Sequence, residues 1–244
     1  SRSPAVAQVL AIAPAIANGK TWGNYPAIGH IMSAIFEGGL LDFEAASVVE
    51  SRYFAACATS QVAKNIITSM WYQLNALKKG ASRPHGLPRS KVGRLGILGA
   101  GMMGAGIAYV SAKVGIDVVL LDPTQEAAER GKAYSQGLLD KAVKKGRSTA
   151  EKRDALLSRI TPTTSYEALA GCDLVIEAVF EDRAVKADVT KKAEAAIGAG
   201  AVFASNTSTL PITGLAQASV RPAQFIGLHF FSPVDKMPLV EIIV

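Results

Sequence analysis

Three glycines near the middle of the chain stand at a spacing that suits a loop around a phosphate group. Gly99, Gly101 and Gly104 match the pattern G-x-G-x-x-G. In such a loop the first glycine permits a tight turn, the second lets the backbone approach a diphosphate, and the third lets the next helix pack closely against the strand. Unpaired amides and the positive dipole end of that helix then stabilise the anion. The spacing therefore predicts that the chain binds a dinucleotide.

An acidic residue follows this loop at the distance expected for a contact with a ribose. An apolar strand expected at 95–98 enters the loop, a helical pattern at 105–114 leaves it, and a second apolar run at 118–121 ends at Asp122. A carboxylate there accepts a hydrogen bond from a ribose 2′-hydroxyl and repels a 2′-phosphate, so Asp122 favours NAD over NADP. The alternative is a glycine-rich turn without a ligand, and the strand, the helix and the acid together argue against it.

Alternating strands and helices are expected to position these residues. Helical patterns at 124–145 and 183–197 fill two of the intervals between short apolar runs. We therefore predict an α/β protein with a Rossmann-like, doubly wound, mainly parallel sheet, preceded by an α-helical segment. The strands are expected at 94–98, 117–121, 160–163, 174–178, 201–205 and 225–229, with a further strand beginning at Glu241.

The first third of the sequence has helical patterns and no strand signals. Asp42 is expected to cap one helix that runs through Ala58, and Thr59 or Ser60 a second that runs towards Lys79. An apolar stripe on the second helix is interpreted as core or as a domain interface; it consists of Val62, Ile66, Ile67, Met70, Leu74 and Leu77. Residues 80–91 concentrate Gly, Pro and charge, which indicates a boundary between a helical segment at 1–90 and a second domain at 91–244.

Composition limits the class of protein. With 49% hydrophobic and 19% charged residues, the chain is expected to be globular, and the apolar opening at 1–17 is read as part of the fold. The net charge of +6 accompanies interleaved acidic residues and no nucleic-acid motif, so a small anionic substrate is favoured over nucleic acid. No run is long enough to span a membrane. Cys57 and Cys172 have no metal or redox spacing, which favours reduced thiols in a cytoplasmic protein without a metal site.

Three later segments, each at or just past an expected strand end, extend the pattern. They are 177–182 (EAVFED), 205–210 (SNTSTL) and 227–233 (GLHFFSP), and Glu241 follows His229 by 12 residues. Together with the glycine loop, these segments occur in an order and spacing that resembles the 3-hydroxyacyl-CoA dehydrogenase family over residues 92–244. The resemblance implies NAD-dependent oxidation of L-3-hydroxyacyl-CoA to 3-oxoacyl-CoA in fatty-acid β-oxidation.

The same resemblance implies roles for individual residues. His229 would be the general base, Glu241 the carboxylate that orients its ring, and Ser208 a hydroxyl that contacts both the substrate oxygen and the nicotinamide side of the cofactor. Lys145, in a basic stretch of the helix after Asp122, would approach CoA, although a solvated helix face explains that stretch equally well. The implied cofactor contacts are Gly99, Gly101, Met103, Gly104, Asp122, Val179, Phe180, Glu181, Lys186, Ser208 and Ser232.

Some of these positions have competing interpretations. Without the resemblance, Lys186 would be read as a solvated helix residue and His229 as a core histidine. Glu177 is read as structural, and Asn206 as supporting its loop or touching the site. Ser232 stands where many members of the family carry Asn, so this contact with the cofactor is expected to be lost or replaced by water.

The helical first third resembles the segment that follows the enoyl-CoA hydratase region in multifunctional β-oxidation α-subunits. This resemblance implies a parent protein with hydratase activity, a possible thiolase partner, and a substrate-binding C-terminal domain beyond Val244. We therefore expect turnover by the present chain to be impaired. Two alternatives stay open: another β-hydroxyacid or nucleotide-sugar dehydrogenase, and a non-catalytic NAD-binding or assembly module.

Overall fold

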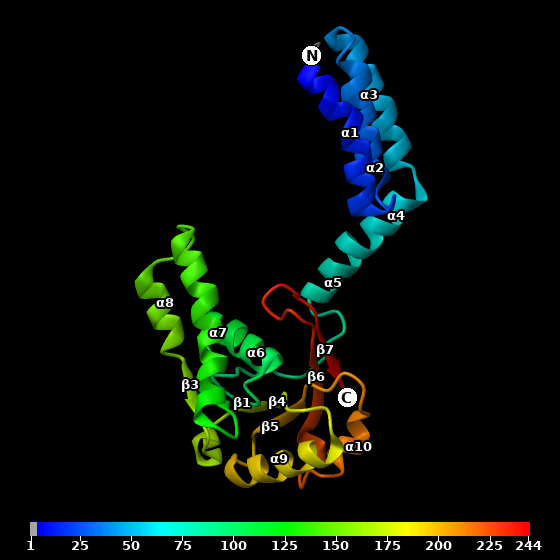
Figure 1. Cartoon of the computed structure of the whole chain (residues 1–244). Helices are drawn as coiled ribbons and strands as arrows, with labels where there is room; N and C mark the ends of the chain where they lie inside the picture. Colours follow the sequence, from blue (N-terminus) through cyan, green and yellow to red (C-terminus); the bar gives the residue numbers. More distant parts are fainter. Residues whose placement is uncertain (1–3) are drawn as a thin grey trace. The chain divides into compact units, whose positions relative to one another are not determined.

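Short apolar segments in the second half of the chain form the strands of one seven-stranded sheet. The computed structural model describes residues 4–244; residues 1–3, which begin the expected helical segment, lie outside the described residues. The sheet has the order β3-β2-β1-β4-β5-β6-β7 (Figure 1). The strands are β1 (Arg94–Leu98), β2 (Asp117–Leu121), β3 (Ile160–Thr163), β4 (Leu174–Glu177), β5 (Val202–Ser205), β6 (Phe225–Phe230) and β7 (Val240–Ile243).

Every neighbouring pair of strands is parallel except β6 and β7. The predicted mainly parallel, Rossmann-like sheet is therefore confirmed. The strand expected near Glu241 runs antiparallel to β6, and the register places His229 opposite Glu241. Because paired residues on neighbouring strands face the same side of a sheet, this register brings the two side chains together.

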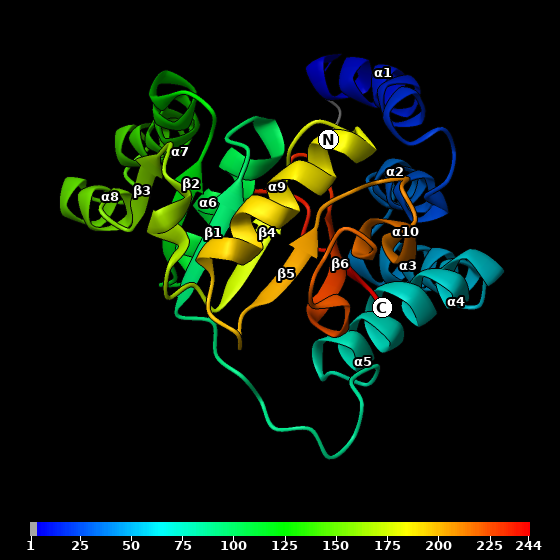
Figure 2. The same ribbon diagram turned by 90° about the horizontal axis from the view of Figure 1, so that it is seen from below.

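Helices cover both faces of the sheet, which is why the strands are almost continuously apolar. One apolar cluster packs α6 against β1 and β2, and another packs α9 and α10 against the opposite face (Figure 2). Helices α8 and α10 are additional to the expected ones. The bounds are α6 (Met102–Lys113), α7 (Gln125–Lys144), α8 (Ala150–Leu157), α9 (Arg183–Ala196) and α10 (Ile212–Ala216), with 3₁₀ turns η2 (Tyr166–Leu169) and η3 (Pro222–Gln224).

The described chain divides into two units between Pro88 and Arg89. The first unit is helical, and two of its helix starts have the predicted caps: Asp42 accepts from Ala45 N at 2.8 Å, and Ser60 accepts from Ala63 N at 3.1 Å. A π-helical segment interrupts the second of these helices. The elements are α1 (Pro4–Thr21), α2 (Pro26–Gly38), α3 (Phe43–Ala58), α4 (Gln61–Ile67), η1 (Thr68–Gln73) and α5 (Leu74–Lys78).

The apolar stripe of this unit does not form a core. Its six residues from Val62 to Leu77 are all exposed, and helices α2 to α5 contain no buried residue. The interpretation of the stripe as core within its own unit was therefore wrong, because in residues 4–88 α2 and α3 pack mainly on each other and the stripe stays exposed. Cys172 is buried, whereas Cys57 is only half-buried. Among residues 4–244, no helix combines the length and hydropathy that a membrane crossing requires.

Candidate active site

The glycine loop joins β1 to α6, and two of its glycines are required by the protein itself. Gly99 has a φ of +93°, and a Cβ there would lie 2.7 Å from the carbonyl oxygen of Ala178. A Cβ on Gly104 would lie only 1.8 Å from the carbonyl oxygen of Gly99, so this glycine allows α6 to start directly beside the loop. A Cβ on Gly101 would meet no atom within 4 Å. The space beside Gly101 suits the close approach of a diphosphate to the backbone.

Asp122 directly follows β2 and lies beside the same loop. Its Oδ2 accepts a hydrogen bond from Ala100 N at 2.8 Å, and within the described residues Oδ1 has no hydrogen-bond partner. The carboxylate borders a cavity of about 410 Å³, whose size and polar edge suit one half of a dinucleotide. The cavity is lined by Ala100, Gly101, Met102, Ala105, Asp122, Ala127, Arg130, Gly131 and Tyr134. The residues present therefore fit the NAD expected from the sequence.

Sequence reasoning missed the contribution of α7 to this cavity. Arg130, Gly131 and Tyr134 line its wall, and a Cβ on Gly131 would lie 2.8 Å from the carbonyl oxygen of Ala100. Helix α7 starts soon after Asp122, so its first turns lie next to the glycine loop. The spacing of Arg130 and Tyr134, four residues apart on one face of that helix, was therefore the available signal.

A second pocket, of about 240 Å³, lies at the carboxyl ends of β4 and β5. It brings together four predicted site residues, Met103, Val179, Glu181 and Ser208, and it is completed by Ala178, Asn206 and Thr209. Phe180 is not part of its wall, and this residue is 81% exposed. In open parallel sheets, ligands bind at this edge of the strands.

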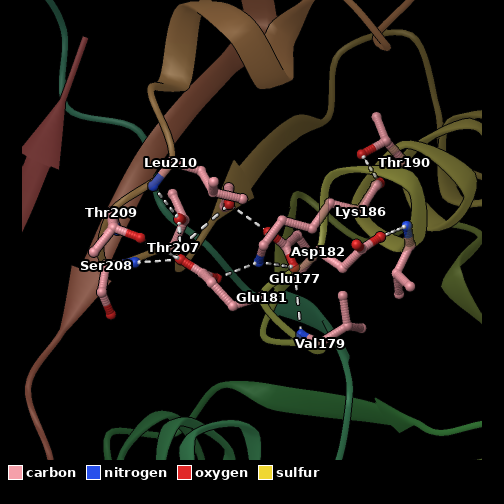
Figure 3. Close-up of polar contacts among 12 residues, drawn as sticks. Glu177, Val179, Glu181, Asp182, Lys186, Thr190, Thr207, Ser208, Thr209 and Leu210 are labelled. Atoms are coloured by element: carbon pink, nitrogen blue, oxygen red, sulfur yellow. Dashed lines mark hydrogen bonds and ion pairs between the residues drawn. The ribbon is translucent and has the colours of Figure 1, made fainter.

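Glu181 organises the loop after β5 (Figure 3). Its Oε1 accepts from Thr207 Oγ1 at 2.5 Å and from the backbone N–H of Ser208 at 3.1 Å. Burial opposes ionisation of this carboxyl, but hydrogen bonds from Thr207 and Lys186 outweigh it and hold the pKa of Glu181 below its ordinary value. Glu181 is therefore an anion at neutral pH.

Lys186 and Glu177 form a buried ion pair below this loop. Lys186 Nζ lies 2.8 and 3.0 Å from the two carboxylate oxygens of Glu177 and 3.1 Å from Glu181 Oε2. The side chains of Lys186 and Glu177 are 3% and 1% exposed, and the hydroxyl of Ser205 also donates to Glu177. The reading of Lys186 as a solvated helix residue was therefore wrong, because α9 turns this face towards two carboxylates. The structural reading of Glu177 agrees with these contacts.

His229 and Glu241 form the polar pair expected from the resemblance. His229 Nδ1 lies 2.7 Å from Glu241 Oε2, across the β6–β7 pairing, and the His229 side chain is 17% exposed. An ionised carboxylate at this distance can only accept, so it favours the tautomer that carries the proton on Nδ1 and leaves Nε2 as the ring's acceptor. Asn206 Oδ1 accepts from Phe230 N at 2.9 Å, so the end of β5 is tied to the strand that carries the histidine.

Ser232 and Lys145 are among the predicted residues that do not line either pocket. Ser232 Oγ is 3.8 Å from Met102 Sδ, in a segment that also packs Val234 against Gly106 of α6. Lys145 is exposed at the end of α7. In the part of the chain that the structure describes, no group of three His, Cys, Asp or Glu side chains is arranged to hold a metal ion.

The parallel sheet, the glycine loop, the acid at the end of β2 and the pockets at the carboxyl edge define a Rossmann-type dinucleotide-binding domain. Residues 94–244 match the sequence profile described as "3-hydroxyacyl-CoA dehydrogenase, NAD binding domain". The chain belongs to the 3-hydroxyacyl-CoA dehydrogenase family of NAD-dependent oxidoreductases.

Individual relatives agree with this assignment. The chain is 40% identical over 225 residues, 92% of its length, to the fatty acid oxidation complex subunit alpha of Shewanella sp. (strain W3-18-1), of which it spans 32%. It is 41% identical to the (S)-3-hydroxybutyryl-CoA dehydrogenase structure from Ralstonia eutropha, with a TM-score of 0.60, over 62% of this chain and 54% of that one. It is 37% identical to the 3-hydroxybutyryl-CoA dehydrogenase structure from Escherichia coli K12, with a TM-score of 0.60, over 63% and 32% of the two chains.

Proposed function

We propose that the protein oxidises L-3-hydroxyacyl-CoA to 3-oxoacyl-CoA with NAD, with His229 as the general base. The observation that carries the proposal is the 2.7 Å pair between His229 Nδ1 and Glu241 Oε2, held by the β6–β7 register at the edge of the sheet where ligands bind. The names of the relatives, which are dehydrogenases of 3-hydroxybutyryl-CoA, support the substrate class.

In the proposed reaction, His229 Nε2 takes the proton of the substrate hydroxyl while the hydrogen on the same carbon leaves as hydride, so that the carbon becomes a carbonyl. NAD, when bound, would supply the nicotinamide that takes up this hydride. Imidazole suits the task because it changes charge close to neutral pH. The carboxylate of Glu241 stabilises the imidazolium that forms and keeps the ring in the tautomer with a free Nε2.

Ser208 is proposed to contact the reacting oxygen and the nicotinamide side of the cofactor. Its backbone is held by Glu181, its side chain borders the 240 Å³ pocket, and a hydroxyl both donates and accepts. The backbone around Val179 and Phe180, together with Met103, is proposed as the floor for the same part of the cofactor. Ser232 is proposed to contact the cofactor weakly. Lys145 is proposed to contact CoA.

The context of the whole protein is also a proposal. The relative from Shewanella is an α-subunit of a fatty acid oxidation complex, which supports the expectation that residues 1–90 follow a hydratase region and that a thiolase subunit is the partner. A C-terminal domain that positions the acyl chain would then be needed for full turnover.

The test is acetoacetyl-CoA-dependent oxidation of NADH by the full-length protein. His229→Gln is expected to lower kcat by about 10²-fold to 10⁴-fold, the usual contribution of a general base. His85→Gln, in the exposed linker, is the matched control and should keep the wild-type rate. Undiminished turnover by His229→Gln would reject the histidine as base, and NADH binding without hydride transfer in the wild type would favour a non-catalytic module.

A further inference from the structure

Asn206 places a mostly buried amide side chain at the carboxyl end of β5, in the wall of the 240 Å³ pocket. The residue directly follows the strand and is 9% exposed. Its backbone N–H donates to the carbonyl oxygen of Glu177 at 2.9 Å, which fixes it beside the end of β4. The side chain therefore starts from a defined position.

The amide of Asn206 has one orientation that suits its neighbours. Its Oδ1 lies 2.9 Å from Phe230 N. A backbone N–H can only donate, so the side-chain atom that meets it is the oxygen, and the NH₂ group is directed elsewhere. Phe230 directly follows His229 on β6. The oxygen end of Asn206 therefore holds the strand that carries the proposed base.

The NH₂ end of the same side chain has no partner in the protein. Within residues 4–244, Asn206 Nδ2 donates to no protein atom, and it is not among the fully enclosed polar atoms without a partner, which are Ser135 Oγ and Gln224 Oε1. A mostly buried amide donor destabilises a protein unless a ligand or water accepts from it. Because Asn206 lines the 240 Å³ pocket, this pocket is where the acceptor can lie.

The other walls of the pocket indicate which acceptor this is. Met103 and Val179, which are proposed as the floor for the nicotinamide side of NAD, line it, whereas His229 does not. The substrate hydroxyl must lie beside the His229 ring, so the pocket suits the cofactor better than the reacting oxygen. The nicotinamide ring carries a carboxamide, and its carbonyl oxygen can accept from an NH₂ group.

We propose that Asn206 is a further cofactor-binding residue, which donates from Nδ2 to the carboxamide oxygen of the nicotinamide while its Oδ1 holds Phe230 N. One side chain then fixes the nicotinamide relative to the strand of His229. The identity of the ligand rests on the proposed function, whereas the link between Asn206 and β6 does not.

Asn206→Asp tests the donor alone, because a carboxylate still accepts from Phe230 N but has no N–H to donate. Titrations of the 244-residue chain compare NADH with ADP-ribose, which has the same adenosine and diphosphate but no nicotinamide. Asn206→Asp is expected to weaken NADH binding about tenfold and to leave ADP-ribose affinity within about twofold of wild type. Asn65→Asp is the matched control, since it makes the same change on exposed α4, where Oδ1 accepts from Gln61 Nε2 at 2.8 Å. It should alter neither affinity.

Three results of these titrations would overturn the proposal. Equal weakening of NADH and ADP-ribose would mean a general effect of the added charge. Unchanged NADH affinity would mean that the amide does not contact the cofactor, and a raised KM for acetoacetyl-CoA in the full-length protein would then assign it to the substrate. If the chain without substitutions does not bind NADH, the proposed function and the contact of Asn206 with the cofactor fail together.

Amide hydrogen exchange at Phe230, measured by NMR without ligand, tests the oxygen end of the side chain. Asn206→Ala removes the acceptor and is expected to accelerate exchange at Phe230 N about tenfold, while Asn206→Asp keeps its protection and the amides of β1 are unchanged in both. Unaltered exchange at Phe230 in Asn206→Ala would overturn the link to β6. This measurement decides that link even if NADH does not bind.

Discussion

Asp122 is the residue that should decide which dinucleotide enters the 410 Å³ cavity. Its Oδ2 is held by Ala100 N, and the neighbouring wall carries Arg130, a cation that would suit a 2′-phosphate if the carboxylate were neutral. We expect Asp122→Asn to shift the ratio of NADPH to NADH affinity by about tenfold towards NADPH, as for the loss of one charged contact. Fluorescence titration with the two nucleotides measures this ratio.

The control for that substitution lies at the other end of the same strand. Asp117 begins β2 and pairs with Arg159 on the surface, so Asp117→Asn should leave the ratio of affinities unchanged. If Asp122→Asn leaves the ratio of NADPH to NADH affinity unaltered, Asp122 does not contact the ribose.

Glu181 should make the free energy of unfolding depend on pH in the acid range. Because the pKa of Glu181 is lower in the folded chain than its ordinary value of 4.5, its ionised form stabilises the fold above that value, and this contribution disappears as pH falls through the lower, folded pKa. Glu181→Gln is expected to lower the unfolding temperature at pH 7 by at most about 3 °C, since the carboxylate is partly screened by solvent.

Calorimetric scans of wild type and Glu181→Gln across acid pH check this expectation. The difference between the two proteins should vanish at the acid end, where the wild-type carboxyl is itself neutral. A difference that stays constant with pH would mean that Glu181 contributes through packing and not through its charge.

At the scale of elements, the glycine motif at the junction of β1 and α6 contains one glycine that the packing of the protein requires, Gly104, and one that we expect only the ligand to require, Gly101. Gly104→Ala places a methyl group 1.8 Å from a carbonyl oxygen and should destabilise the chain by about 3 kcal/mol or more. Gly101→Ala meets no protein atom, so it should change the free energy of unfolding by less than about 1 kcal/mol while weakening NADH binding about tenfold or more.

Denaturant unfolding and NADH titration on the two variants give both quantities. Equal loss of stability in the two variants would show that a methyl group at position 101 also clashes with the protein. Unaltered NADH affinity in Gly101→Ala would show that the diphosphate does not bind beside this residue.

Most of the sheet could be predicted because its strands are buried on both faces and therefore appear as apolar runs between helical patterns. The direction of β7 could not, since pairing with β6 depends on a contact between distant parts of the chain. Helices α8 and α10 are short, eight and five residues, so their patterns are too brief to stand out.

The candidate site divides in the same way. Gly99, Asp122, Ser208 and His229 could be found from local motifs or from the resemblance. The burial of Lys186 could not, because an isolated lysine on a charged helix is usually solvated and its two carboxylate partners are identified only by the fold.

At the scale of the molecule, the glycine loop, both pockets and the His229–Glu241 pair all belong to the unit that begins at Arg89. Both apolar clusters of the sheet also lie within this unit. We therefore expect residues 89–244 to fold alone and to bind NADH within about threefold of the affinity of the whole chain. Circular dichroism and NADH titration of this shorter protein measure both, and an unfolded product would show that the helical unit is required for folding.

The central claim is that NAD lies along the carboxyl edge of the sheet, with its diphosphate at Gly101 and its nicotinamide beside His229. A crystal structure of the chain with NAD⁺ bound tests it most directly. We predict the diphosphate within hydrogen-bond distance of the backbone amides at the start of α6, and the nicotinamide ring between Ser208 and His229 Nε2. A diphosphate bound away from the glycine loop, or a nicotinamide on the far side of the sheet from His229, would contradict the account.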